Sequence, residues 1–171
     1  MILKIKIALF ILTVISIKLF FVAINEIGDK KVDRMKEIIS FTDYLKVYSC
    51  DMKMSIDEIL EKYNFRNDEI KIICNRLPVE IKKSCMRIKN SNFASFIEST
   101  IMTPNEFNSC FAEIANYYGS AYSDVLEQKL SITRSEMDKC MKEYDEKHKE
   151  KKNMYNKVSI LFGCLTAVIF I

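Results

Sequence analysis

Apolar residues recur along most of this chain at the three- and four-residue spacing of an α-helix, and two segments are apolar almost throughout. The first segment, residues 5–24, has twenty residues, enough for a helix of about 30 Å, the thickness of a bilayer's hydrocarbon core. The second, residues 158–171, has fourteen and covers only about 21 Å. We expect both to enter a membrane, the second with local bilayer thinning and snorkelling of Lys157.

The first apolar segment also fits a cleaved signal peptide, because Lys4 and Lys6 precede it. The small-residue cleavage site is missing and the run leads straight into a charged helical sequence, which favours an uncleaved anchor. Lys18 has no acidic partner in either apolar segment, so we expect it to snorkel. Gly163 and Ala167 form a small-x-x-x-small pair that allows close packing against the first segment, although such a pair also arises by chance.

Between the apolar segments the spacing predicts two long helices and several short ones. The first long helix continues from the membrane segment, and the second runs from Ser123 to Ile171, 49 residues or about 73 Å. The expected inward stripe of the first consists of Met35, Ile38, Ile39, Thr42, Tyr44, Leu45, Tyr48, Ser49 and Met52. That of the second consists of Leu126, Leu130, Met137, Cys140, Met141 and Tyr144.

Start and stop signals delimit the first short helices. Ser55 and Glu58 form a capping box, and Asn67 can cap the next helix, which Pro78 is expected to end. The expected inward residues are Ile56, Ile59, Leu60 and Tyr63, then Ile70, Ile73, Cys74 and Leu77, and then Ile81, Cys85 and Ile88 on a separate basic helix.

A further piece around Phe93, Phe96 and Ile97 precedes the clearest helix start. Thr103 is the expected cap, Pro104 the first helical residue and Glu106 the end of a capping box. The expected inward residues of that helix are Phe107, Phe111, Ile114, Ala115 and Tyr118, and Gly119 should stop it. The sequence therefore predicts an all-α fold, an antiparallel helical bundle between two membrane-embedded terminal helices. Its parts are a transmembrane segment (1–28), a bundle (29–157) and a short membrane segment (158–171).

Positive charge near the apolar segments predicts the orientation. Residues Lys30, Lys31, Arg34 and Lys36 follow the first segment, and Lys147, Lys149, Lys151, Lys152 and Lys157 precede the second. Because positive residues near membrane ends stay in the cytoplasm, we expect a cytoplasmic bundle. The stretch from Lys147 to Lys157 nets +4 and is expected to attract anionic lipid headgroups.

Composition argues against catalysis. The chain has one His and three widely spaced Gly, so it lacks phosphate loops and His-rich zinc sites, and its six Cys form no C-x-x-C pair. Reduced thiols are favoured over three disulfides. Residues 26–157 carry 23 acidic and 23 basic side chains, so they net to zero and give no nucleic-acid footprint. We expect no enzyme, no cofactor, no metal and no small-molecule substrate.

One stretch departs from this balance. Between Lys89 and Lys129 there is no Lys or Arg, and the stretch carries five acidic residues. A basic partner could dock there through charge complementarity; the alternative is a solvated face whose carboxylates favour helix starts. The candidate partner-binding residues are Glu98, Glu106, Glu113, Asp124 and Gln128, the last two lying four apart on one helix face.

Two local motifs carry a resemblance. One is Glu150-Lys151-Lys152-Asn153-Met154-Tyr155 before a tail containing Gly163, and the other is Tyr118-Gly119 followed by Asp124 and Gln128. With the overall layout, they resemble the stage III sporulation protein AB family of endospore-forming bacteria. That family usually has Leu-Gly nearer the Asp and a Trp in the central helices; here Tyr118 replaces the Leu and there is no Trp.

The resemblance implies a non-enzymatic component of a membrane complex in the mother-cell membrane around the forespore, linked to a channel between the two cells. Its bundle resembles the cytoplasmic domain of type II secretion F platform proteins. The implied partners are a secretion-type ATPase, the stage III sporulation protein AA, and other stage III sporulation membrane proteins. The alternative is a two-span membrane protein with an extracellular helical-bundle sensor domain, which requires the opposite orientation and an output domain.

Overall fold

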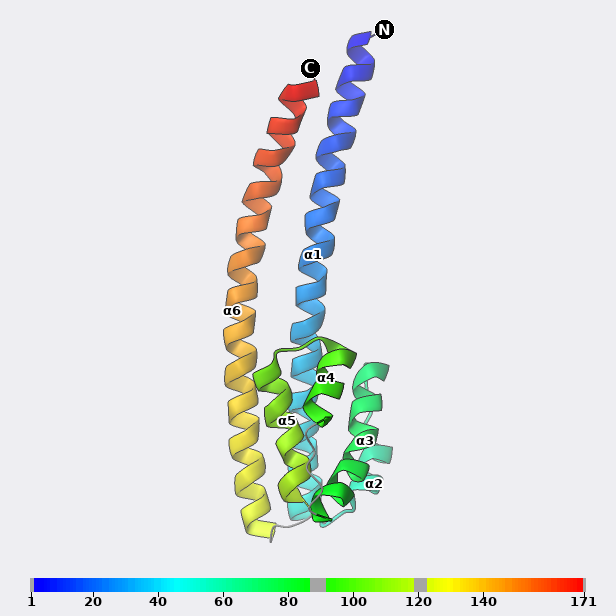
Figure 1. Ribbon diagram of the computed structural model, residues 1–171, viewed down its shortest axis with the longest axis vertical. Helices are drawn as coiled ribbons and strands as arrows, with labels where there is room; N and C mark the ends of the chain where they lie inside the picture. The colour runs from blue at the N-terminus through cyan, green and yellow to red at the C-terminus, as the bar shows by residue number, and fades with distance from the viewer. Residues whose placement is uncertain (1, 87–91, 119–122, 171) are drawn as a thin grey trace. The chain divides into compact units, whose positions relative to one another are not determined.

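The computed structural model describes residues 2–86, 92–118 and 123–170, and this part of the chain contains helices and no strand (Figure 1). The all-α prediction is confirmed. The elements are α1 (Ile2–Lys46), the π-helical turn η1 (Val47–Asp51), α2 (Ile56–Lys62), α3 (Asp68–Cys85), α4 (Phe93–Ile101), α5 (Asn105–Tyr118) and α6 (Ser123–Phe170).

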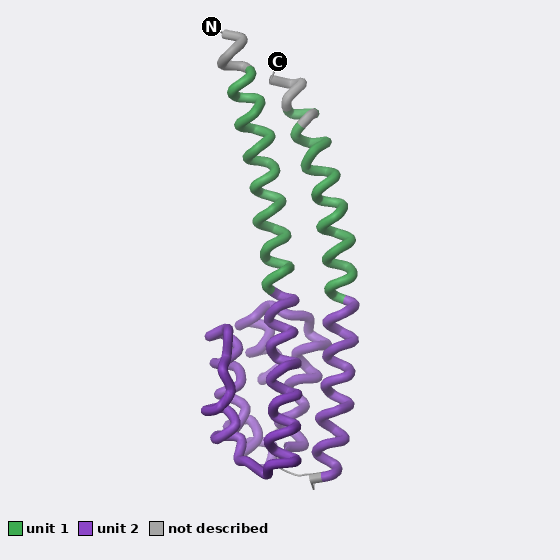
Figure 2. The backbone as a smooth tube through the Cα atoms, turned by 180° about the vertical axis from the view of Figure 1, so that it is seen from behind, with its two compact units in different colours: residues 1–30, 144–171 green, residues 31–143 purple. Residues whose placement is uncertain are grey.

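The chain divides into two compact units, to both of which α1 and α6 contribute (Figure 2). One unit, the bundle, comprises residues 31–143, a narrower range than the 29–157 expected from the sequence. The other, the paired-helix unit, comprises residues 1–30 and 144–171.

The bundle has an apolar core centred on aromatic side chains. Phe41 of α1 packs against Phe111 of α5, with ring centroids 6.5 Å apart, and both are fully buried. The predicted stripe on α1 is buried at Met35, Ile38, Ile39, Thr42 and Leu45 and half-buried at Tyr44, and it did not include the buried Phe41. Met52, expected to face inward, is exposed. In the π-helical turn η1, backbone hydrogen bonds join residues five apart rather than four apart. The extra residue rotates the positions that follow α1, so Met52 no longer lies on the buried face.

The capping box that opens α2 is present. Ser55 Oγ accepts from the Glu58 amide (3.4 Å), and the Glu58 carboxylate accepts from the Ser55 amide (3.1 Å). Asn67 Oδ1 likewise accepts from the Glu69 amide at the start of α3 (3.0 Å).

The prediction that Pro78 ends its helix is wrong, because α3 continues through it to Cys85. Proline removes one backbone hydrogen bond, but Leu77 and Ile81 on either side stay buried on one face, and this packing offsets the loss. In a continuous α-helix, a residue four positions further along is rotated by about 40° around the helix axis. Cys85 therefore leaves the buried face and is exposed, contrary to expectation, while Ile88 lies outside the described residues.

Helix α5 begins at Asn105, and the buried Thr103 exchanges two hydrogen bonds with the Asn108 side chain. Tyr117 rather than Tyr118 is buried, and Gly119 lies outside the described residues. The long helix expected from Ser123 is confirmed as α6, which has 48 residues.

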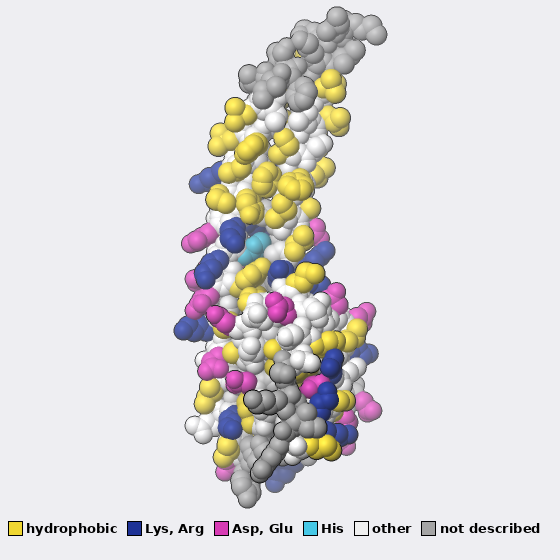
Figure 3. Space-filling view, viewed as in Figure 1, with side chains coloured by type: hydrophobic (Ala, Val, Ile, Leu, Met, Phe, Trp, Pro, Cys, Tyr) yellow, Lys and Arg dark blue, Asp and Glu magenta, His cyan; other side chains and the backbone are white. Residues whose placement is uncertain are grey.

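The paired-helix unit consists of two antiparallel helical segments, which expose mainly apolar side chains over residues 7–22 and 160–165 and charged side chains over residues 26–30 and 145–157 (Figure 3). The exposed residues are Ile7, Leu9, Ile11, Leu12, Ile15, Leu19, Phe20 and Val22 on α1 and Ile160, Leu161, Phe162 and Leu165 on α6. Among the described residues, α1 alone has the length and composition to cross a membrane, and its most apolar window has no buried residue. Membrane association through α1 is therefore supported, and a second crossing by residues 158–171 stays a prediction.

Gly163 lies where the two segments of this unit meet. A Cβ atom at Gly163 would lie 3.4 Å from Val14 Cγ1, so the backbone of α6 approaches α1 closely there. The side chain of Ala167, the other member of the expected small-residue pair, lies outside the described residues.

Candidate partner-binding surface

The α5–α6 hairpin positions most of the side chains in this surface. The hydroxyl groups of Tyr117 and Thr133 are buried and hydrogen-bond to each other between the two helices. Lys129 Nζ lies 5.2 Å from the centroid of the Tyr117 ring, a cation–π arrangement. These contacts fix the rotation of α6 relative to α5, and so decide which side chains share the surface between them.

Four exposed glutamates line this surface and form what we call the acidic strip. Glu106 and Glu113 come from α5, and Glu136 and Glu143 come from α6; in each helix the two are seven residues, about two turns, apart. Cys110 and Cys140 lie among them, with Cys110 Sγ 3.9 Å from Glu136 Oε2.

The charge of each of the four glutamates contributes to the environment of at least one of the two cysteines between them. Burial, followed by the charges of Cys140, Glu136 and Glu113, raises the pKa of Cys110 to about 11. Burial also raises the pKa of Cys140, with further contributions from Glu106, Glu143 and Glu136, while the charge of Lys139 opposes them. Both thiols therefore stay protonated near neutral pH and are poor nucleophiles.

Tyr117 reports the same negative field from the buried side of the hairpin. Burial raises its pKa to about 12, the Thr133 hydrogen bond opposes this, and the charges of Glu113 and Glu136 add to it. The arrangement is suited to holding cationic side chains by charge rather than to covalent chemistry.

The structure brings together two of the five candidate residues predicted from the sequence, Glu106 and Glu113. Glu98 on α4 and Asp124 and Gln128 at the start of α6 are exposed, and within the described residues no hydrogen bond or ion pair joins them to the acidic strip. Glu136 and Glu143 were not predicted, because the stretch without Lys or Arg ends at Lys129. Their seven-residue spacing, matching that of the α5 pair, was the available signal.

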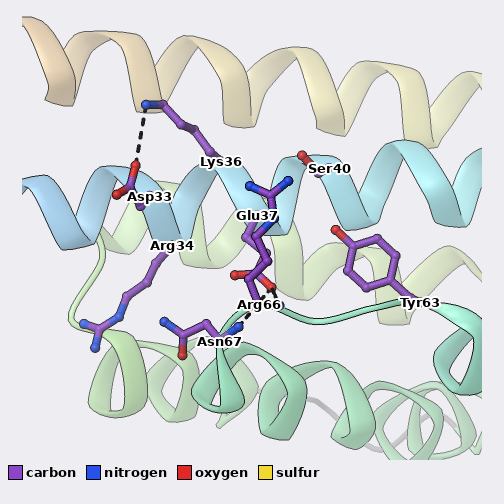
Figure 4. Close-up of a pocket in the computed structure, with 8 residues that line it drawn as sticks. All are labelled: Asp33, Arg34, Lys36, Glu37, Ser40, Tyr63, Arg66 and Asn67. Atoms are coloured by element: carbon purple, nitrogen blue, oxygen red, sulfur yellow. Dashed lines mark hydrogen bonds and ion pairs between the residues drawn. The ribbon is translucent and has the colours of Figure 1, made fainter.

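A cavity of about 390 Å³ lies elsewhere in the bundle, between α1 and the connection from α2 to α3 (Figure 4). The Glu37 carboxylate accepts from the amides of Arg66 (2.6 Å) and Asn67 (3.3 Å). Arg34 donates to the Ile101 carbonyl (3.2 Å) and pairs with Glu69. These charges tie the short helices to α1, so we assign them a structural role. The lining residues are Asp33, Arg34, Lys36, Glu37, Ser40, Tyr63, Arg66 and Asn67.

Comparison with known proteins identifies the family. Residues 6–171, nearly the whole chain, match the family model described as stage III sporulation protein AB. The chain belongs to the stage III sporulation protein AB family. The resemblance drawn from its layout and motifs is thus confirmed, and the chain is a sporulation protein. No curated protein and no solved structure matches it.

In this family member, two of the five basic residues beside the second apolar segment form ion pairs with carboxylates of the protein. Lys149 pairs with Asp145 on its own helix (2.6 Å), and Lys152 pairs with Asp29 of α1 (2.7 Å). The other three, Lys147, Lys151 and Lys157, are exposed. Protein carboxylates thus neutralise two of the five charges expected to attract lipid headgroups.

The Asp29 pair belongs to a polar seam inside the paired-helix unit, formed by Gly28, Asp29, His148 and Lys152. His148 Nε2 lies 2.9 Å from Asp29 Oδ1, and its ring occupies the space where a Cβ of Gly28 would be. The hydrogen bond from Lys152 is the main cause that lowers the pKa of Asp29; desolvation opposes it, and the His148 hydrogen bond adds to it. The sequence analysis used the single His only to exclude zinc, so it did not anticipate this seam.

Proposed function

We propose that this protein is a non-enzymatic platform component of a sporulation-specific, secretion-like complex that serves the channel between mother cell and forespore. In this role it lies in the mother-cell membrane around the forespore, with its bundle in the cytoplasm. It couples a cytoplasmic secretion-type ATPase, the stage III sporulation protein AA, to the membrane subunits of the complex. Family membership and the exposed apolar surface of α1 support the sporulation and membrane parts of this proposal.

The acidic strip is the observation that carries the docking step. Four exposed carboxylates at this surface create a local negative field, and two of them, Glu113 and Glu136, add to the burial that raises the pKa of Cys110. Such a field steers and orients a partner that presents Lys and Arg side chains. The strip therefore fits a basic surface of the ATPase.

Helix continuity supports the coupling step. α1 runs without a break from Ile2 to Lys46, so one helix contains both the apolar membrane segment and core residues of the bundle. α6 likewise runs from the acidic strip to Phe170. Force applied at the strip can thus pass along backbone hydrogen bonds instead of through a loop.

Charge reversal tests the docking step. In the full chain, Glu106→Lys with Glu113→Lys should weaken capture of purified AA protein by on the order of tenfold or more, because two attractive pairs become repulsive. Capture on nickel resin from detergent extracts, over a range of salt concentrations, measures this effect.

A matched control separates the strip from net charge. Glu98→Lys with Asp124→Lys makes the same charge change at exposed sites outside the strip and should leave capture within about twofold, apart from long-range steering. Equal loss in both double variants would show that overall charge, not the strip, governs binding. Unchanged capture in the strip variant would refute docking there.

Orientation is tested by thiol labelling in protoplasts. Lys147→Cys, at an exposed position, is placed in a chain whose native cysteines are replaced by alanine, and a membrane-impermeant maleimide is added. Labelling only after lysis is expected for a cytoplasmic bundle. Labelling of intact protoplasts would place the bundle outside and refute ATPase coupling.

A further inference from the structure

One charged side chain lies inside the apolar segment of α1. Between Ile7 and Ile24 the only Asp, Glu, Lys or Arg is Lys18, and its side chain is exposed on the surface of the paired-helix unit. In a membrane that surface meets hydrocarbon, where an ammonium group is costly unless a counter-charge accompanies it.

The chain itself does not supply this counter-charge. Its acidic residues all lie between Glu26 and Glu150, outside both apolar segments. Within the described residues, no hydrogen bond or ion pair joins Lys18 to another side chain. The partner of the ammonium group therefore comes from a lipid or from another protein.

Helix geometry opposes snorkelling to lipid headgroups, which the sequence analysis expected. The nearest end of the apolar segment is Ile24, six residues or about 9 Å along the helix, whereas Ile5 is about 20 Å away. Every Cα–Cβ bond of an α-helix tilts toward the N-terminus, so the Lys18 side chain starts out pointing away from Ile24. It would have to fold back along the helix, and an extended lysine spans only about 6 Å from Cα to Nζ. A carboxylate at the depth of Lys18 pairs with it without that bend.

Lys18 also belongs to a stripe of exposed side chains, which we call the Lys18 stripe. Ala8, Ile11, Ile15, Lys18 and Val22 follow one another at alternating three- and four-residue spacing, the pattern of a helix that packs against another. Ile11, Ile15 and Val22 are exposed by 51%, 49% and 48%. A single polar residue in such a stripe selects the partner helix and fixes its register.

The contact with α6 uses other residues of α1. Val14 lies beside Gly163, and the Phe21 ring packs against the Tyr155 ring, with centroids 5.5 Å apart. Neither Val14 nor Phe21 belongs to the Lys18 stripe. The stripe is therefore free to meet another helix while α1 and α6 stay paired.

We infer that the Lys18 stripe is the docking site for a membrane helix of another protein, and that this helix carries an Asp or Glu level with Lys18. The ion pair neutralises both charges within hydrocarbon, and the isoleucine and valine side chains on either side pack against the partner helix. This inference rests on the membrane part of the proposed function. It gives the chemistry by which a membrane subunit would recognise this protein.

Photo-cross-linking in sporulating cells tests the contact. The photoreactive residue p-benzoylphenylalanine replaces Ile15 in the tagged full chain. Irradiation should join the chain to one membrane protein, through a peptide of an apolar segment that contains Asp or Glu. The control places the same residue at Phe20, an exposed position on another side of α1, and should give at least about fivefold less of this product.

Charge variants of Lys18 separate a protein partner from lipid. In the Ile15 cross-linking chain, Lys18→Leu should lower the product about tenfold, and Lys18→Arg should keep it within about twofold. Lys18→Glu should abolish it, and replacing the partner's acid by Lys should restore it. The amount of chain in the membrane fraction is measured for every variant. Unchanged product in Lys18→Leu, a cross-linked segment without an acid, no rescue by the exchanged charges, or adducts with lipid alone would each overturn the inference.

The outcome is independent of ATPase docking and of orientation. Lys18 lies in the membrane whichever side the bundle faces, so the Ile15 product is expected even if protoplast labelling places the bundle outside. Glu106→Lys with Glu113→Lys should leave this product unchanged, and Lys18→Leu should leave capture of the AA protein unchanged. Loss of that capture in Lys18→Leu would show that the variant acts through the bundle, and would overturn a separate membrane contact.

Discussion

The two units of this protein place their apolar side chains on opposite surfaces. In the bundle, Phe41, Phe111 and their neighbours are fully buried, and charged side chains other than Glu80 lie at or near the surface. In the paired-helix unit, leucine and isoleucine side chains lie outside, while Asn25, Asp29, His148 and Ser159 lie at or near the helix contact. A chain that uses both arrangements is suited to two solvents, with lipid as the surroundings of the apolar surface.

The same contrast explains which interactions stabilise each unit. Apolar burial drives association only where the alternative is water, so the bundle gains from its core. Helices in lipid gain little from apolar contact and depend on close backbone approach and polar pairs. In the paired-helix unit α6 approaches α1 closely at Gly163, beside Val14, and the seam around Asp29 adds polar pairs.

The largest effect should come from truncating the core of the bundle. Phe111→Ala should destabilise the bundle by about 3–5 kcal/mol, because it leaves a cavity at a fully buried site. Leu12→Ala, at an exposed position of the paired-helix unit, should change bundle stability by less than about 0.5 kcal/mol. Hydrogen exchange of α5 peptides in detergent-solubilised protein measures both, and similar exchange in the two variants would contradict the contrast.

An intermediate effect is expected at Gly28. Gly28→Ala places a Cβ in the space of the His148 ring, so the ring must move, at a cost of about 1–3 kcal/mol. Hydrogen exchange in residues 144–157 should rise about fivefold or more, with α5 unchanged. Adding His148→Ala should restore part of the protection in a double-mutant cycle. Strictly additive effects would show that the glycine and the ring are not coupled.

The smallest effect concerns the charge of Asp29. Its pKa is lowered in the folded protein, so its contribution is present above the unfolded pKa of about 4 and is lost as the pH falls through the folded value. Because this carboxylate is half-exposed, Asp29→Asn should cost no more than about 1 kcal/mol at pH 7.

Thermal unfolding of the wild type and of Asp29→Asn at pH 7, 5, 4 and 3 measures this. The difference should still be present at pH 5 and shrink only below about pH 4. A difference already gone at pH 5 would assign the titration to another group.

Local signals in the sequence were sufficient for most helices. Ser55 with Glu58, and Asn67, act within one turn, and the structure shows both caps. The prediction at Pro78 was wrong because packing against residues distant in sequence offsets the local cost of a proline inside a helix. The absence of Lys and Arg between Lys89 and Lys129 identified Glu106 and Glu113, but not the glutamates beside them on α6.

The polar seam was beyond sequence reasoning for a related reason. Asp29 and His148 are separated by 119 residues, and neither lies in a recognisable motif. Their proximity depends on the relative rotation of two helices, which Gly28 fixes by leaving room for the ring.

The seam also supplies a built-in spectroscopic probe. His148 is the one histidine among 171 residues, so in nuclear magnetic resonance the whole protein has a single imidazole side chain. Labelling with isotopically enriched histidine would therefore give one set of ring signals without any engineered tag. Because that ring lies between the α1 and α6 segments of the paired-helix unit, its chemical shifts report changes in the contact between them when a candidate partner is added.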